Sequence, residues 1–264
     1  MRDFGSSRRT GSIGCHTTHD RPQRARVVVP AVDDSLAIRL LSLVLSIVAG
    51  SADVIGFLVL DGLFTAHITG NIVVLAARLV AGEQAPLSHL LAVPVFMLVL
   101  GLTRLLAARL ERARMPSLLP LLLLELLLLS SFFAVGLAAG PTANPNAART
   151  VLAGMLGVAA MAVQNALMRI SLTGVPSTAV MTTNITAFTM DLGEILLAQD
   201  PARVAKARER IRYTGMAIAG FIVGCTIGAA CEHIYGLRSL VVPIGFASLA
   251  LALGPLATAQ HSRS

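Results

Sequence analysis

Long apolar stretches dominate this chain and limit the folds that it can adopt. Runs of about 20 apolar residues recur between residues 36 and 256, and each can cross a hydrocarbon layer about 30 Å thick as a helix. Charged residues make up 13% of the sequence, whereas a soluble domain carries about 25%. The sequence therefore predicts an all-α integral membrane protein.

One polar phrase occurs twice inside these apolar stretches. The first copy runs from Thr65 to Ile72, and the second runs from Thr178 to Ile185, 113 residues later. Each copy contains the motif Thr-x-Asn-Ile. Paired polar segments at corresponding positions indicate two related halves, and in membrane proteins they point to a binding site where the halves meet.

Basic residues decide how many of the apolar segments cross the membrane, because arginine and lysine favour the cytoplasmic side. Eight segments can be drawn, at residues 36–60, 66–82, 88–108, 117–139, 147–168, 177–198, 211–231 and 238–256. The N-terminal tail, Arg109–Arg114 and Arg203–Arg212 all become cytoplasmic only if the two segments that hold the polar phrase do not cross completely. We therefore expect about six transmembrane helices in two inverted repeats, each with a broken or re-entrant polar segment. A chain of seven or eight spans that obeys the charge rule weakly is the alternative.

The same reasoning divides the chain into three regions. We expect a disordered basic cytoplasmic tail at residues 1–34, a transmembrane domain at 35–257 with repeat halves at about 36–139 and 147–256, and a short C-terminal tail at 258–264. The net charge of +7 lies mainly in the tail and at helix ends, which indicates anionic lipid at the cytoplasmic face and not nucleic acid. We expect a bacterial inner-membrane protein with both termini in the cytoplasm.

Two carboxylates interrupt apolar spans, and a carboxylate at membrane depth is costly enough to be a functional-site hypothesis. Asp53 shares a helix face with Ser46, Gly50 and Gly56, and Glu125 interrupts a run of leucines. Both are candidates for proton coupling. Alternatively, Asp53 accepts hydrogen bonds where helices pack closely, and Glu125 pairs with an arginine or a backbone group or lies at an interface.

Uncharged polar side chains supply the other candidates for binding a solute. Hydroxyl and amide groups suit a polar solute, or they satisfy backbone groups that are freed where a helix breaks. These candidates are Thr69, Asn71, Gln164, Asn165, Thr182 and Asn184.

Two further patterns predict contacts between helices. Arg78 and Asp191 occupy equivalent positions in the two copies and could form an ion pair between the halves; otherwise Arg78 snorkels to the interface and Asp191 lies near a helix end. Gly220, Gly224 and Gly228 recur every four residues, which predicts close packing against another helix. The partner helix is either in the same chain or in a second copy, so a homo-oligomer is a further hypothesis.

Several of these segments together resemble the YoaK-like family of bacterial multi-pass membrane proteins of unknown function. The resemblance covers roughly residues 36–256 and rests on Asp53–Leu58, Thr65–Asn71, Gln164–Ala166 with Arg169, and Thr178–Thr186. It implies about six transmembrane helices. His67 and Thr183–Asn184 depart from the family's usual residues, and the resemblance implies no reaction or substrate.

Motifs of several enzyme classes are missing from the sequence. No Walker loop, Rossmann glycine pattern, HExxH or GxSxG occurs, so an ATP-driven pump or a known hydrolase class has no support, and we expect no cofactor and no metal site. The leading hypothesis is a secondary transporter or permease for a small polar solute, possibly coupled to protons. A membrane scaffold that uses the glycine run and the basic tail is the alternative, and an enzyme that acts on lipid is a third hypothesis.

Overall fold

The computed structural model describes residues 36–84, 86–140, 144–197 and 199–261, and all regular structure in these ranges is helical. The expected tail at residues 1–34 lies outside them. The last helix continues to His261, past the expected end of the membrane domain at residue 257. The helices are α1 Leu36–Val59, α2 Ile68–Val80, α3 Leu87–Arg112, α4 Leu118–Ala139, α5 Ala148–Ile170, α6 Met181–Leu197, α7 Pro201–Tyr235, the short 3₁₀ helix η1 Gly236–Leu240 and α8 Val241–His261.

Of the eight α-helices among the described residues, six are long and two are short. Within the described residues, α1, α3, α4 and α5 are each long and apolar enough to cross a membrane, and a fifth apolar stretch, Pro201–Ala257, contains α7 and most of α8. The helices α2 and α6 have 13 and 17 residues and contain the second part of each polar phrase. The chain is therefore an all-α membrane protein, and its two polar segments form helices shorter than the long spans.

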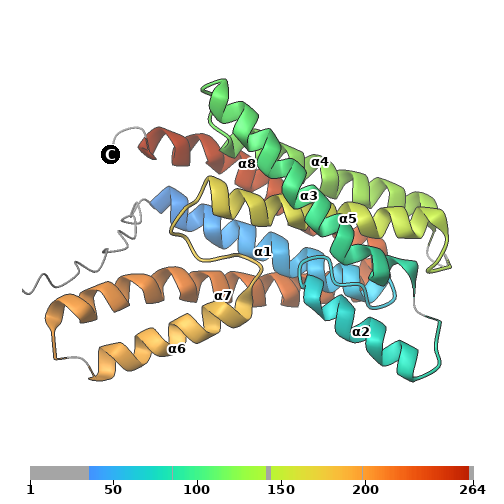
Figure 1. Cartoon of the computed structure of the whole chain (residues 1–264), viewed down its shortest axis with the longest axis horizontal. Helices are drawn as coiled ribbons and strands as arrows, with labels where there is room; N and C mark the ends of the chain where they lie inside the picture. The colour runs from blue at the N-terminus through green and yellow to red at the C-terminus, as the bar shows by residue number, and fades with distance from the viewer. Residues whose placement is uncertain (1–35, 85, 141–143, 198, 262–264) are drawn as a thin grey trace, which may run out of the picture.

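The two halves of the chain repeat one order of helices. A long helix is followed by a short one and then by two long ones, first in α1–α4 and again in α5–α8. The helix α1 packs on α7 and α8, and correspondingly α5 packs on α3 and α4; α2 packs on α3 as α6 packs on α7. Figure 1 shows that α1 and α5 run in opposite directions along the bundle.

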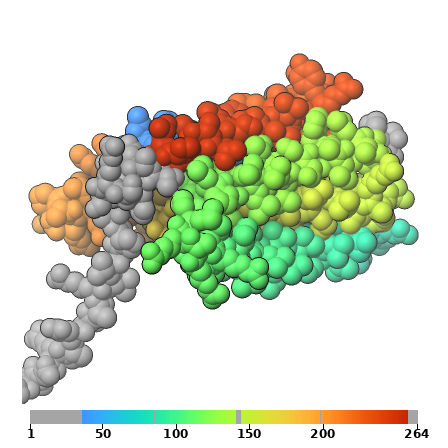
Figure 2. All heavy atoms as spheres, turned by 90° about the horizontal axis from the view of Figure 1, so that it is seen from above, coloured from blue at the N-terminus to red at the C-terminus, as the bar shows by residue number. Residues whose placement is uncertain are grey.

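The helices α1 and α5 form the centre of the bundle and are its most buried spans. They form the apolar core with α4 and α8: Leu45, Leu121, Val163 and Ala250 pack in one cluster, and further along the bundle Val48 packs in the next. Seen from above, α8 lies on one flank of the molecule and α3 on the other (Figure 2). The outer helices thus expose apolar surface, which suits contact with lipid.

Each short helix begins after a segment of irregular backbone. Asp61 and Gly62 take positive φ angles of 56° and 87° at the end of α1, and Gly174 takes 88° after α5. Such angles cannot continue a right-handed helix, so the chain turns at these points. It passes through short non-helical segments before α2 and α6 begin. In Figure 1, both short helices start near the middle of the molecule and run toward opposite ends.

The helix α7 begins ten residues before the apolar span at 211–231 that the sequence indicated. The side chain of Asp200 accepts a hydrogen bond from the amide of Ala202 at 3.0 Å, and Pro201 occupies the first turn, where its missing N–H costs nothing. A helix of 35 residues is about 52 Å long, which exceeds the hydrocarbon thickness. The basic first turns of α7 therefore extend beyond the apolar part of the bundle.

The glycine run of α7 lies against α1 of the same chain. A Cβ atom on Gly224 would lie 2.4 Å from the carbonyl oxygen of Ile47, and one on Gly50 would lie 2.3 Å from the carbonyl oxygen of Phe221. Gly220 and Gly228 face Leu43 and Ser51 in the same way. Backbone atoms of the two helices thus approach each other so closely that only glycine fits.

Replacing Gly224 tests this close approach. We expect Gly224→Ala to force α1 and α7 apart and to lower the free energy of unfolding by about 1–3 kcal/mol, the usual cost of overpacking. Gly101→Ala is the matched control, because nothing lies within 4 Å of its added Cβ atom. Thermal unfolding in detergent, followed by circular dichroism, measures both. Equal midpoints for the two variants would contradict the packing described here.

Candidate functional site

The carboxylate of Asp53 holds the segment that leads into α2. Its Oδ1 accepts hydrogen bonds from the amides of Ala66 at 2.6 Å and of His67 at 3.4 Å, and its Oδ2 lies 2.6 Å from His67 Nδ1. Asp53 is 4% exposed. A negative group at the start of a helix satisfies amides that have no partner inside the helix. Asp53 therefore fixes the first polar break through both the backbone and the imidazole ring.

Asn71 completes this break from inside α2. Its Oδ1 accepts a hydrogen bond from the amide of Phe64 at 2.9 Å, and its Nδ2 donates one to the carbonyl oxygen of the same residue at 2.8 Å. The side chain is completely buried. Both backbone groups of Phe64 are thus satisfied by a single amide, as a membrane environment demands.

The second break is held by the equivalent asparagine, Asn184. The preceding long helix, α5, also contributes a side chain, which is Gln164 where α1 contributes Asp53. Asn184 Nδ2 donates to the carbonyl oxygen of Ser177 at 2.6 Å, seven residues before it, which is the same separation as that between Asn71 and Phe64. Gln164 Nε2 donates to Thr178 Oγ1 and to the carbonyl oxygen of Leu45, each at 2.7 Å. The two copies of the polar phrase therefore fold alike around their asparagines.

Both breaks line one cavity, which we call the central cavity. Its volume is about 540 Å³, and its wall includes residues 66–69 of the first copy and 179–182 of the second. Of the predicted candidates, Thr69, Thr182 and Asn165 line it, and it also contains Arg104 from α3 and Arg169 from α5. The structure thus brings together polar segments that lie 113 residues apart in the sequence.

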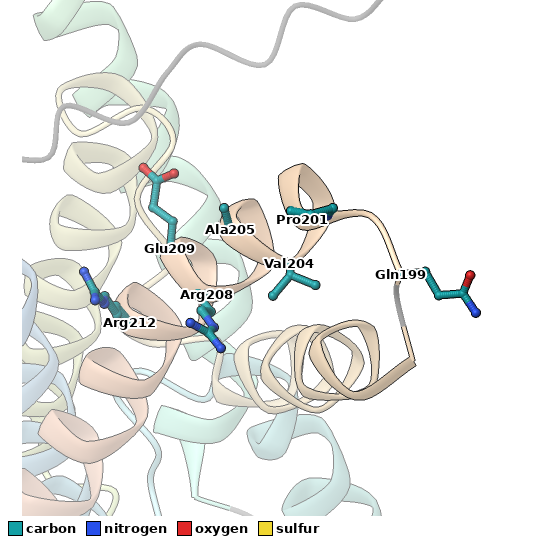
Figure 3. Close-up of a pocket in the computed structure, with 7 residues that line it drawn as sticks. All are labelled: Gln199, Pro201, Val204, Ala205, Arg208, Glu209 and Arg212. Carbon is teal, nitrogen blue, oxygen red and sulfur yellow. The ribbon is translucent and has the colours of Figure 1, made fainter.

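A second cavity of about 870 Å³ shares Asn165, Arg169 and Val180 with the central one. It lies along α6 and α7, and its wall contains Asn184 and charged side chains, which are Asp191, Lys206, Glu209 and Arg210. A surface hollow lies at the first turns of α7, and Arg208 and Arg212 form part of its lining (Figure 3). Polar surface thus extends from the start of α7 to the central cavity.

The possible ion pair between Arg78 and Asp191 is not formed. Arg78 binds Asp61 instead, with Nη1 at 2.7 Å from Oδ2. Asp191 accepts a bifurcated hydrogen bond from Arg210 Nε, at 2.9 Å to Oδ1 and 3.1 Å to Oδ2. The reason is geometric: α2 and α6 run apart from the middle of the molecule, so equivalent positions in them are far from each other (Figure 1). Each charge is matched by a neighbour in the adjoining turn or helix.

Glu125 lies apart from both cavities. It is completely buried on α4, and neither carboxyl oxygen has a hydrogen-bond partner among the described residues. Leu122 and Leu129, on either side of it along the helix, pack against α1, α5 and α8. Nothing in this part of the structure pairs Glu125 with an arginine, which was one expectation from the sequence.

Three arginines of the site were not among the residues that the sequence indicated. In the sequence, Arg169 belongs only to the motifs of the family resemblance, Arg104 lies near the end of an apolar span, and Arg210 belongs to a basic cluster that orients the chain. A charged residue inside an apolar segment was the available signal for Arg104.

Within the described residues, no group of three His, Cys, Asp or Glu side chains could hold a metal ion.

The two asparagines allow a graded test of how the breaks are held. Asn71 satisfies two backbone groups and Asn184 one, and each buried group left without a partner costs about 1–3 kcal/mol. We therefore expect Asn71→Leu to lower thermal stability in detergent more than Asn184→Leu does. Leu58→Ala, a change at an exposed apolar residue of α1, serves as the control. The reverse order of the two asparagine variants would show that the breaks are held by other contacts.

A comparison with known proteins places the chain in a family. Neither a curated protein nor a solved structure matches it. One family model, described as protein of unknown function (DUF1275), matches residues 41–253, which include all the helices described above except the outer turns of α1 and α8. The chain therefore belongs to this family of uncharacterised proteins.

Proposed function

We propose that the protein is a permease or secondary transporter for a small polar solute, which binds in the central cavity. One observation carries the proposal: both copies of the repeated polar phrase line the same cavity. Transporters commonly hold their substrate between discontinuous helices of two halves near the middle of the membrane. The opposite directions of α1 and α5, and the matching contacts of the two halves, support an inverted repeat.

The basic residues support an orientation for this transporter. The end of α3 and the start of α7 lie at the same end of the bundle as the start of α1 (Figure 1). Arginines of the first two segments include Arg109, Arg112, Arg203 and Arg208. With this end in the cytoplasm, the charge rule is obeyed by six crossings. We therefore propose a bacterial inner-membrane protein with both termini cytoplasmic and with anionic lipid around its basic end.

The scaffold hypothesis has less support. Its working parts were the glycine run and the basic tail. The glycines of α7 pack against α1 inside the chain and so are not free for a partner helix, and the tail lies outside the described residues. The lipid-enzyme hypothesis needs clustered catalytic groups near one interface, whereas the cavity wall combines two hydroxyls, one imidazole, one carboxamide and two guanidinium groups.

Transport is tested with the full chain reconstituted in liposomes. We expect uptake of at least one class in a panel of sugars, polyols, amino acids, organic acids and inorganic ions. Thr69→Val and Thr182→Val should each lower the uptake rate about 5- to 10-fold, because each removes one hydrogen-bonding group worth about 1 kcal/mol from the cavity wall. Thr226→Val is the control, since the only partner of its hydroxyl among the described residues is the carbonyl of Ile222 in its own helix. Absence of uptake for every class would overturn the proposal.

Coupling to protons is tested in the same liposomes, and the two candidate carboxylates differ. Asp53 binds His67, whose ring lines the cavity, whereas Glu125 is enclosed by apolar side chains. We expect Asp53→Asn to abolish solute-driven proton movement and Glu125→Gln to preserve it, as measured with a pH-sensitive dye. The opposite result would assign coupling to Glu125. Solute uptake without proton movement in the unmodified protein would contradict coupling and leave the permease proposal standing.

A further inference from the structure

The central cavity has a positively charged wall. Arg104 and Arg169 line it, and no acidic residue is among its described lining residues. Arg104 lies 3.3 Å from Glu111, but both side chains are more than half exposed, and such a pair contributes at most about 1 kcal/mol. Arg169 forms no ion pair with any residue that the structure describes. Both guanidinium groups are therefore available to a ligand in the cavity.

The two arginines and the polar breaks belong to one continuous wall. Phe96, Leu100 and Arg104 follow one another at intervals of four residues and so form a single face of α3 that lines the cavity. Arg169 lies in the last turn of α5, one helical turn beyond Asn165, which also lines the cavity. A ligand can therefore contact the breaks at one end while its charge meets the arginines.

The starts of the two short helices differ in charge. Asp53 places a carboxylate on the amides that lead into α2, whereas Ser177 occupies the matching place before α6. Its neutral hydroxyl oxygen lies 3.4 and 3.3 Å from the amides of Ala179 and Val180. Among the described residues, no carboxylate accepts hydrogen bonds from the amides that lead into α6, as Asp53 does from those that lead into α2. The positive end of the α6 dipole thus adds to the charge of the two arginines.

We propose that the ligand of the central cavity is a small anion, with its charge between Arg104 and Arg169 and its remaining polar groups against Thr69, Thr182 and the start of α6. This inference rests on the proposed transport function and names the class of its substrate. Guanidinium groups bind carboxylate, phosphate and sulfate oxygens in pairs of parallel hydrogen bonds. A volume of about 540 Å³ accepts an inorganic oxyanion or a small organic acid.

Anion binding is measured on the purified full chain in vesicles of phosphatidylcholine, with inorganic phosphate, sulfate and succinate as probes. We expect at least one probe to raise the unfolding temperature with a saturable dependence on concentration. Sodium and choline salts of that anion should act alike, and glycerol should have no effect. Arg104→Gln and Arg169→Gln should each raise the apparent Kd about 10- to 100-fold, because a charge-assisted contact is lost. Arg104→Lys should retain part of the affinity.

Arg109→Gln is the matched control, because it removes an exposed arginine from the same helix outside the cavity. Unchanged affinity in both cavity variants, or an equal loss in Arg109→Gln, would overturn the proposed site. Uptake of neutral or cationic solutes that no anion inhibits would overturn the anion inference and leave transport standing. Arginine-dependent anion binding without uptake of any solute would overturn transport and leave the anion site standing.

A phosphate-bearing lipid headgroup has the same chemistry as a free anion, and the vesicle composition separates the two sources. A free anion should stabilise the protein in pure phosphatidylcholine. If stabilisation requires phosphatidylglycerol and disappears in Arg104→Gln and Arg169→Gln, the anion site is supported and its ligand is a lipid headgroup. If phosphatidylglycerol stabilises these variants and the unmodified protein equally, the lipid acts elsewhere, and the free anions alone decide the proposal.

Discussion

Backbone hydrogen bonding is the constraint on which the rest of this structure depends. Inside a membrane, every N–H and C=O group needs a partner from the protein or from a water-filled space, and a broken helix frees several of them at once. This chain breaks two of its apolar segments and satisfies backbone groups at each break with an asparagine seven residues downstream of Phe64 or Ser177. The polar phrase is repeated because each break needs an asparagine at this position, which is Asn71 in the first copy and Asn184 in the second.

The two halves satisfy the backbone groups of their breaks with different side chains. As a result, the two breaks differ in charge. Asp53 supplies a negative group to the first break, and Gln164 and Ser177 supply neutral groups to the second. The helix start of α2 is thereby neutralised from within the protein, whereas that of α6 is not. Arg104 and Arg169 then add positive charge to the same cavity. Two halves with the same order of helices thus line one cavity with different side chains.

Much of the fold was predictable because its signals are local. Apolar length identified the six long helices, and the arginine clusters set apart the segments around Asn71 and Asn184, which form the two shorter α-helices. Pairings were less predictable, because they depend on which helices become neighbours. Asp191 pairs with Arg210 across the turn between α6 and α7, and Arg78 pairs with Asp61. The place of Arg169 in a cavity wall was not predictable, because an arginine at the end of a span usually extends to the membrane interface.

The two arginines and the broken helices both require a polar space inside the bundle. A guanidinium group near the apolar part of a membrane is costly unless it faces water, a partner or a ligand, and Arg104 and Arg169 face the central cavity. The first amides of α6 need the same polar space, because a helix start leaves them without partners inside the helix. A chain selected for packing alone would avoid both costs with one unbroken apolar helix. The presence of both features around one cavity therefore supports the proposal of a polar ligand over a role in helix packing alone.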